Sequence, residues 1–229
     1  MTETMDETSS TGPGPLPVRL ARVFFSPGEV FTDLREEPRW FGPLLVGSIL
    51  VGLSMVLVPA EVWIQSMREQ AAVQGGEIPD FLTSAGPAFR LVSVISSVVF
   101  YFLWAFLLAG IVTFVFAFLF GDEGRYSQYL SVVAHALFIT SVGSLLLLPL
   151  RIAQEDPQLT LSLGTFFIFM EGGYLFRVLK LMDLFGLWSY AVMAVGVTRI
   201  DPRRGLGFAL FFFMAFALAF ALVFGAFGG

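Results

Sequence analysis

Residues 180–199 read KLMDLFGLWSYAVMAVGVTR, and this stretch decides the fold class. Lys180 and Asp183 stand one helical turn apart at its start. The run from Leu184 to Thr198 carries no charge, and Arg199 follows it directly. Apolar segments with charged residues at their ends are typical of membrane-spanning helices, because charged groups are costly in the hydrocarbon core. The stretch therefore predicts one span of a membrane protein.

The composition of the whole chain indicates the same class. Of its 229 residues, 56% are hydrophobic and 14% are charged, and the mean hydropathy is +0.81. Soluble domains carry about 25% charged residues. The net charge of −5 disfavours a nucleic-acid partner, because binding phosphates needs clustered Lys and Arg. The chain has no cysteine, which excludes disulfides, iron–sulfur clusters and thiolate metal sites. We expect no cofactor.

The N-terminal part divides into a tail and two short helices. Residues 1–16 are polar and acidic, so we expect a disordered tail. Two short amphipathic helices follow. Ser26 and Glu29 have the spacing of a capping box at the start of the second, and Pro27 suits its first helical position. Both helices are too short to cross a bilayer. We expect them to lie at the membrane interface, or to form a packing collar around the first span.

Residues 17–229 are predicted to form a single all-α, membrane-embedded domain, a bundle of five transmembrane helices. The spans are expected at about 40–60, 91–120, 127–150, 181–198 and 206–227. The second is long, at roughly 45 Å against a hydrocarbon core of about 30 Å, so it must tilt, kink or protrude. Small residues four apart predict close helix contacts. They are Ser48, Gly52, Ala136, Thr140, Ser144, Ala217, Ala221 and Gly225.

Two connecting segments also carry expectations. Residues 61–74 keep a helical period, so we expect them to extend the first helix into solvent or along the membrane interface. Residues 159–173 are too short for a span, and they could be interfacial, re-entrant or part of the fourth helix. An interfacial helix leading into the fourth span is the interpretation we favour.

The distribution of basic residues predicts the orientation. With five spans, one side of the membrane holds eight arginines and the other holds five basic residues. The larger set is Arg19, Arg22, Arg35, Arg39, Arg125, Arg199, Arg203 and Arg204. Basic residues favour the cytoplasmic side, so we expect a multi-pass protein of the cell (plasma or inner) membrane with its N-terminus in the cytoplasm and its C-terminus outside.

Four polar or aromatic residues are candidates for function. His135 lies deep in the third span, where an ionisable residue suggests a proton relay or a ligand contact; the alternative is a hydrogen bond to a hydroxyl group on a neighbouring helix. Lys180 and Asp183 could pair on one helix face and bind a substrate or headgroup. Alternatively, Asp183 caps a helix and Lys180 reaches the headgroups. Trp188 is expected to be an interfacial anchor or packing residue rather than part of a binding cage.

Two segments resemble a known family. They are SPGEVFTDLREEPRWFGPLL at 26–45, with Pro27, Phe31, Pro38 and Pro43, and DLFGLWSYAVMAVGV at 183–197, with Asp183, Phe185, Trp188 and Gly196. Their order and spacing resemble the Yip domain of Ypt/Rab-interacting integral membrane proteins, in a short, prokaryotic-type form. The resemblance implies five spans and a cytosolic N-terminus. Eukaryotic members bind prenylated Rab-type GTPases, but the short tail of this chain does not support the same activity here.

The sequence favours a protein that is not an enzyme, because it contains none of the motifs for nucleotide hydrolysis, serine hydrolysis or zinc proteolysis. The leading hypothesis is a scaffold or adaptor that acts through helix–helix and partner contacts. Its partners would be the lipid bilayer, a membrane or cytosolic protein, or a second copy of itself. One alternative is a small transporter or channel-like subunit that uses His135 and Asp183. Another is a lipid-binding or bilayer-shaping protein.

Overall fold

The computed structural model describes residues 12–73, 75–77, 86–167, 169 and 172–227. The described chain is helical and contains no strand; its one β-type contact is an isolated antiparallel bridge between Ser162 and Asp183. Residues 1–11 of the expected disordered tail lie outside the described residues. Helix formation starts at Leu16, inside the segment for which disorder was expected.

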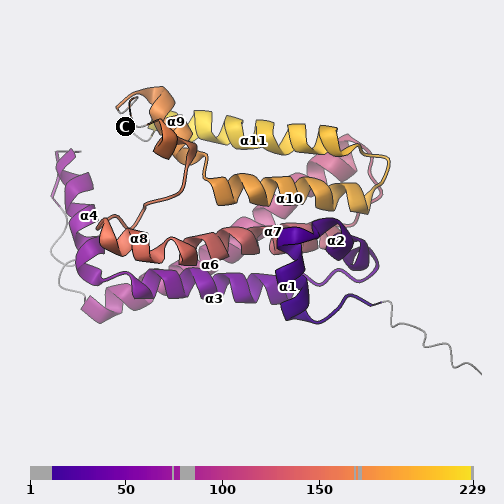
Figure 1. Ribbon diagram of the computed structural model, residues 1–229, viewed down its shortest axis with the longest axis horizontal. Helices are drawn as coiled ribbons and strands as arrows, with labels where there is room; N and C mark the ends of the chain where they lie inside the picture. The colour runs from indigo at the N-terminus through magenta and orange to yellow at the C-terminus, as the bar shows by residue number, and fades with distance from the viewer. Residues whose placement is uncertain (1–11, 74, 78–85, 168, 170–171, 228–229) are drawn as a thin grey trace, which may run out of the picture.

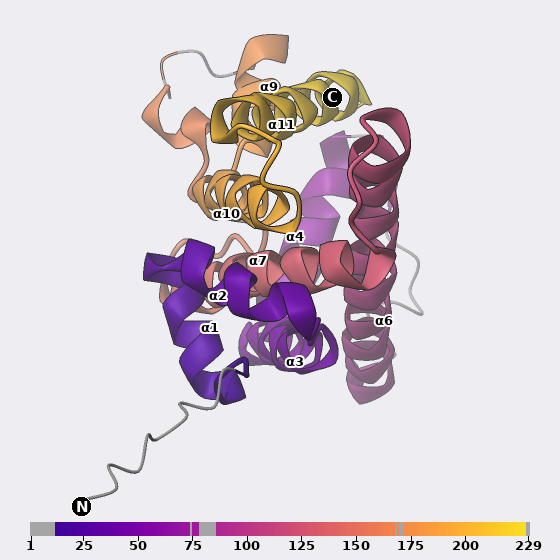
Figure 2. The same ribbon diagram turned by 90° about the vertical axis from the view of Figure 1, so that its right-hand side faces the viewer.

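Five long helices run between the two ends of the bundle (Figure 1). They are α3 (Phe41–Leu57), α6 (Gly86–Thr113), α7 (Tyr126–Leu146), α10 (Leu184–Ile200) and α11 (Leu206–Phe227). α7 is the central helix and packs against α3, α6 and α10, while α11 packs on α10 (Figure 2). Most of α7 is buried in the protein, which explains why its sequence is apolar on every face.

Small and hydroxylated residues lie where these helices approach closely; Ser144 is one of the residues predicted for such contacts, and the other residues in these contacts were not predicted. The Oγ of Ser54 on α3 lies 3.1 Å from the Oγ of Ser144 on α7. The hydroxyl of Ser141 donates to the hydroxyl of Tyr101 on α6 over 3.0 Å. A Cβ at Gly47 would lie 2.2 Å from that Tyr101 oxygen, so only glycine fits there.

Three helical segments of the described chain are long and apolar enough to cross a membrane: Arg90–Leu119, Tyr126–Ala153 and Leu206–Ala226. A fourth is obtained if α3 and the helix after it form one broken span, and α10 is a shorter apolar helix. The all-α, polytopic membrane fold is therefore confirmed, while the count of five spans stays a prediction.

The long second span changes its helical geometry near its end. The α-helix α6 continues directly into the π-helix η1 (Phe114–Leu119), and Phe116 in η1 is fully buried. A π-helical turn is wider than an α-helical one, so it redirects the side chains that follow it. The π-helical segment is the change of geometry that this long span contains, and a short turn from Gly121 then leads into α7.

The predicted helix at 61–74 is present, but it is not collinear with the first span. Instead of continuing straight, the chain bends by 83° between α3 and α4 (Ala60–Val73). Pro59 explains the bend, because a proline removes a backbone donor and disfavours helical geometry in the residue before it; Val58 is accordingly extended. α4 lies across the end of the bundle, next to α8 (Leu148–Ala153) (Figure 1).

The helix at the fourth predicted span, about 181–198, begins slightly later than the predicted bound. Lys180 belongs to a separate helix, α9 (Tyr174–Leu181), and α10 begins only at Leu184. The intervening backbone pairs with the segment before it: the amide of Leu163 donates to Met182 and the amide of Leu184 donates to Leu161. The described part of 159–173 holds the short 3₁₀-helix η2 (Leu163–Phe166) in place of the interfacial helix we expected; residues 168, 170 and 171 lie outside the description.

At the other end, α1 (Leu16–Phe25) and α2 (Pro27–Glu36) form a hairpin against the bundle. Pro27 occupies the first turn of α2, as predicted. The expected capping box does not form: Ser26 makes no side-chain capping bond, and Glu29 pairs instead with Arg22 over 2.6 Å.

Candidate functional site

The α1–α2 hairpin docks on the bundle through the apolar face of α2. Val30, Phe31 and Leu34 are each at most 2% exposed. They stand at helical spacing, so they form one stripe that packs against α10 and α7. Phe31 therefore faces protein rather than acyl chains, which matches the alternative of a packing collar.

His135 lies beneath the contact between α2 and the bundle, and it is completely buried. Its Nδ1 is 2.8 Å from the carbonyl oxygen of Ser131, one turn earlier on α7. A carbonyl only accepts, so Nδ1 carries the proton and donates it. The Nε2 has no hydrogen-bond partner among the described residues. The edge of the ring meets Phe31 at a centroid distance of 6.2 Å. Among the described residues, the His135 ring therefore makes no hydrogen bond to a hydroxyl group on a neighbouring helix, which was the expected alternative.

Lys180 and Asp183 do not share a helix face, because the helix is broken between them. Asp183 is the N-cap of α10, and its Oδ1 accepts the amide of Gly186 over 2.8 Å. A carboxylate at this position satisfies a free backbone donor and complements the helix dipole. Lys180 lies on α9, where its backbone packs closely over Gly164. Among the described contacts no ion pair joins the two side chains, and of the two alternatives the geometry favours the capping role of Asp183.

The aromatic and glycine positions of the second motif pack helices together. A Cβ at Gly143 would lie 2.4 Å from the ring of Phe185, so this glycine admits the ring between α7 and α10. Trp188 is 39% exposed, and its ring meets that of Phe24 on α1 edge-on at 5.5 Å.

Gly196 is the point at which three helices meet. A Cβ there would lie 2.4 Å from a methyl group of Val132 on α7 and 3.1 Å from the ring of Phe31 on α2. Gly196 thus permits α10, α7 and the N-terminal hairpin to converge above His135. In the first motif, Pro43 is buried in the first turn of α3, and Pro38 follows the end of α2. The motif positions therefore hold the α1–α2 hairpin against α7 and α10; they do not form a catalytic pocket.

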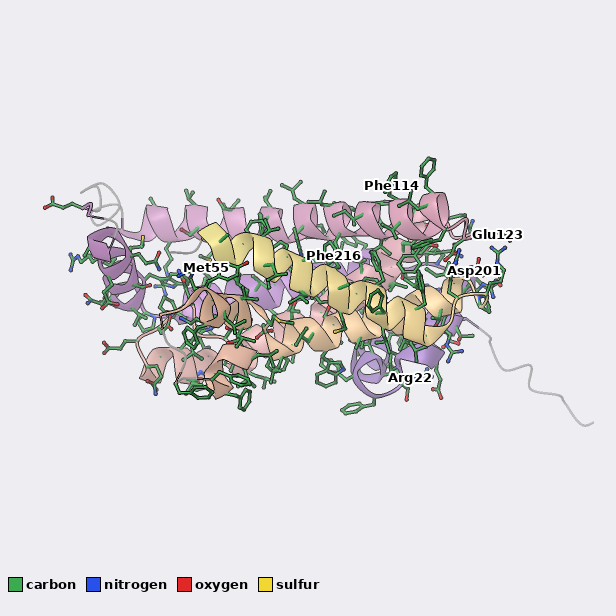
Figure 3. All side chains as sticks on the ribbon, turned by 90° about the horizontal axis from the view of Figure 1, so that it is seen from above. Arg22, Met55, Phe114, Glu123, Asp201 and Phe216 are labelled. Carbon is green, nitrogen blue, oxygen red and sulfur yellow. The ribbon has the colours of Figure 1, made fainter. Side chains whose placement is uncertain are left out.

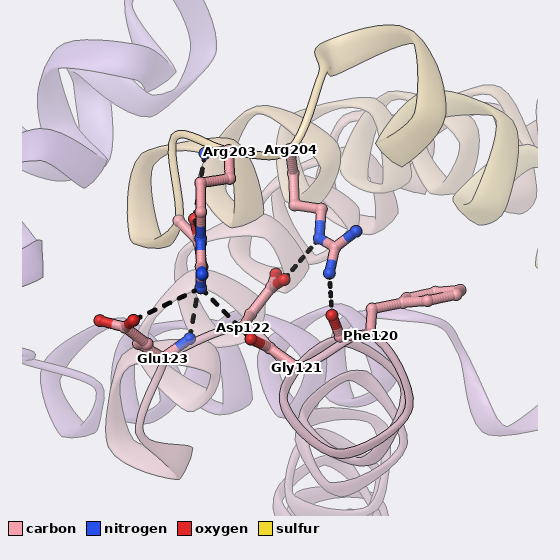
Figure 4. A network of polar contacts seen from close by, with 7 residues as sticks. Phe120, Gly121, Asp122, Glu123, Arg203 and Arg204 are labelled. Carbon is pink, nitrogen blue, oxygen red and sulfur yellow. Dashed lines mark hydrogen bonds and ion pairs between the residues drawn. The ribbon is translucent and has the colours of Figure 1, made fainter.

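Two turns at the same end are joined by a charged network (Figure 4). Asp122, after η1, pairs with Arg204, and the Arg204 guanidinium also donates to the carbonyl of Phe120. Asp201, at the end of α10, receives the side chain of Arg203 at 2.9 Å and the amide of Glu123 at 3.3 Å. We call this set the turn network; it ties the α6–α7 turn to the α10–α11 turn.

The two carboxylates of the turn network have opposite electrostatic character. Hydrogen bonds from the Arg203 side chain hold the pKa of Asp201 well below its ordinary value. Burial raises the pKa of Asp122, against the opposing effect of Arg204. The Asp122 side chain is fully buried, and its Oδ2 has no partner within the described chain. Asp201 is therefore the stably ionised member of the network.

The sequence interpretation missed the turn network, because it treated Arg203 and Arg204 as determinants of topology. One signal was available: both predicted turns, Gly-Asp-Glu-Gly at 121–124 and Asp-Pro-Arg-Arg at 201–204, carry complementary charges. Because both helix pairs are antiparallel hairpins with short turns, their turns can lie side by side at the same end of the bundle.

The described chain contains no group of three or more His, Asp or Glu side chains arranged to hold a metal ion. Its fold and helix contacts define an all-α, polytopic integral membrane protein. Residues 21–225 match the family model of the Yip1 domain, and the chain therefore belongs to the Yip1 domain family. The resemblance seen in the two motifs is confirmed, and the prokaryotic-type assignment stays a prediction. No curated protein and no solved structure matches the chain.

Proposed function

We propose that this Yip-type membrane protein is a scaffold or adaptor without enzymatic activity. The observation that carries the proposal is the N-terminal hairpin, which is fixed to the bundle on one face and charged on the other. Arg22 pairs with Glu29 at 2.6 Å and approaches Asp33 at 3.7 Å. Gln128 of α7 donates to the backbone of Arg35 at 2.7 Å. A fixed surface of this kind offers a partner a preorganised site at low entropic cost.

The orientation belongs to the same proposal. The hairpin, the turn at Glu123 and the turn at Asp201 lie at one end of the molecule, as the labels of Figure 3 indicate, and Met55 lies toward the other. Eight of the thirteen basic residues belong to these segments. This distribution supports placing the hairpin in the cytoplasm and the C-terminus outside, in the cell membrane.

The transporter alternative receives less support from the same contacts. A transport pathway needs polar groups that converge on an accessible site near the middle of the membrane. His135 is packed under Phe31, and Asp183 is engaged as a helix cap. A bilayer-shaping role has one observation in its favour, since Phe25 at the end of α1 is 86% exposed and could enter the interface.

The test is photo-crosslinking in native membranes from the outer face of α2. A photoreactive residue at exposed Thr32 or Glu36 is expected to yield discrete protein adducts, and the same residue at exposed Gln70 on α4 serves as the control. Differently tagged copies separate a self-contact from a second protein. Adducts with lipid alone, or the same adducts from Gln70, would contradict the adaptor proposal.

A further inference from the structure

The end of the bundle opposite the hairpin contains an open cavity that the adaptor proposal does not use. Its volume is about 470 Å³, within the range of small-molecule sites. Five of its lining residues come from α4 and one follows α8: Glu61, Val62, Ile64, Gln65, Arg68 and Glu155.

The polar lining residues of α4 share one helix face. Glu61, Gln65 and Arg68 stand at positions i, i+4 and i+7, so their side chains project in nearly the same direction. Val62 is 9% exposed and Ile64 is partly buried, which gives the cavity an apolar portion beside the charges. The cavity therefore presents two carboxylates, a guanidinium and an apolar surface to one ligand.

The described charged side chains that line the cavity do not form ion pairs with one another. In the part of the chain that the structure describes, no ion pair joins Arg68 to Glu61 or Glu155. The Gln65 side chain donates to Glu69 at 2.7 Å, which leaves the Gln65 carbonyl oxygen available as an acceptor. Opposite charges in one cavity can thus each contact a different group of a bound molecule.

Glu155 has an unusual backbone. Its φ is 52°, in the left-handed region that favours glycine and is costly for a side chain such as glutamate. Its amide donates to Ile152 at 3.3 Å, so the conformation is part of the turn that ends α8. A glutamate at a position suited to glycine places its carboxylate at the cavity despite this cost.

The position of α4 suggests which ligands reach the cavity. α4 bends away from α3 by 83°. If α3 crosses the membrane, as the predicted span at 40–60 requires, α4 runs nearly parallel to the membrane plane. Helices in this orientation lie at the level of the lipid headgroups. The cavity beside α4 is accordingly placed at headgroup depth.

We propose that this cavity binds a zwitterion that carries a primary ammonium and a phosphate, the chemistry of a phosphatidylethanolamine headgroup. An ammonium has three donors, and Glu61, Glu155 and the Gln65 carbonyl oxygen supply acceptors. The guanidinium of Arg68 is suited to contact two phosphate oxygens at once. Val62 and Ile64 contact the apolar part of the ligand. Choline, which is methylated, cannot donate the same hydrogen bonds.

The test measures lipid retention by the full-length protein in native mass spectrometry. The protein is equilibrated with equal amounts of phosphatidylethanolamine, phosphatidylcholine and phosphatidylglycerol that carry the same acyl chains. Only phosphatidylethanolamine can donate ammonium hydrogen bonds to the cavity carboxylates, so we expect about tenfold stronger retention of phosphatidylethanolamine than of the other two lipids. Equal retention of the three would overturn the proposal.

Variants assign the effect to the cavity. Glu61→Gln and Glu155→Gln should each remove most of the preference for phosphatidylethanolamine, and Arg68→Gln should lower the retention of all three phospholipids. Glu77→Gln, an exposed control beyond α4, should change nothing. Glu155→Gly adds a check that does not endanger folding, because glycine favours this backbone: the protein should stay folded and lose the preference. A preference unaffected by these cavity variants would also overturn the proposal.

One further arm identifies the source of the zwitterion. Soluble phosphoethanolamine is added as a competitor against the lipid. Failure to compete at millimolar concentration, together with retention of the lipid, assigns the site to a membrane lipid. Competition at equal concentration assigns it to a free metabolite of the same chemistry. Both results require the ammonium and the phosphate, so they support the site.

Discussion

Replacing Gly196 by alanine tests the convergence of three helices directly. The new methyl group would lie 2.4 and 2.8 Å from the two methyl groups of Val132 and 3.1 Å from the Phe31 ring. Overpacking of this kind costs about 1–3 kcal/mol, while the helix propensity of alanine returns at most about 1 kcal/mol. We expect a net loss of about 1–2 kcal/mol, because the β-branched side chain of Val132 cannot rotate away freely.

A second substitution makes the reasoning specific. Val132→Ala alone removes two buried methyl groups and should cost about 1.5 kcal/mol. In the double variant the clash disappears, so the combined loss should fall short of the sum by about 1 kcal/mol or more. Gly110→Ala is the control, since a Cβ at Gly110 meets no atom within 4 Å.

The assay is thermal unfolding in detergent, followed by tryptophan fluorescence. Each kcal/mol should shift the midpoint by about 2–4 °C for a chain of this size. The reasoning is refuted if Gly196→Ala behaves like Gly110→Ala, or if the losses of the double variant add within about 0.5 kcal/mol.

Three further predictions concern buried and charged side chains. Asp201 has a lowered pKa in the folded protein, so its contribution to stability is present above the ordinary value of about 3.9 and is lost as the pH falls through the folded pKa. The unfolding free energies of wild type and Asp201→Asn should therefore differ by a constant amount at pH 5–7, and the difference should begin to narrow only below about pH 4; a difference that stays constant below pH 4 would contradict this. Arg204→Met leaves the buried carboxylate of Asp122 without its cation and should cost about 3 kcal/mol in unfolding free energy, whereas adding Asp122→Asn should restore part of the loss. His135→Leu should change the unfolding free energy by less than about 1.5 kcal/mol, because it keeps a buried side chain of similar volume and removes a nitrogen without a described partner; a loss above 3 kcal/mol would show that the imidazole has an essential polar contact.

Much of the helical architecture was predictable from hydropathy, because a span must be both long and apolar. The α6–α7 and α10–α11 hairpins follow from uninterrupted apolar runs joined by short polar turns. The resemblance to the family was also visible in the sequence, since it depends on the order and spacing of Pro27, Phe31, Asp183 and Gly196 along the chain.

Three features were not predictable, each for a physical reason. The bend at Pro59 was overlooked because residues 61–74 by themselves keep a helical period. The break before Asp183 depends on backbone pairing with Ser162, which is a contact between segments distant in sequence. The turn network forms because the α6–α7 and α10–α11 turns lie side by side. Hydropathy does not indicate how the two hairpins are positioned relative to each other.

The most direct test of the central claim is hydrogen exchange of the amides of residues 16–36 in lipid nanodiscs. A hairpin held to the bundle by Phe31 and Gly196 predicts slow exchange around Val30–Leu34, comparable to that of α7. It also predicts that Phe31→Ala, which removes a fully buried ring at a cost of about 3–5 kcal/mol, accelerates exchange in both hairpin helices. Exchange of these amides at the rate of an unfolded peptide in the wild type would contradict the account.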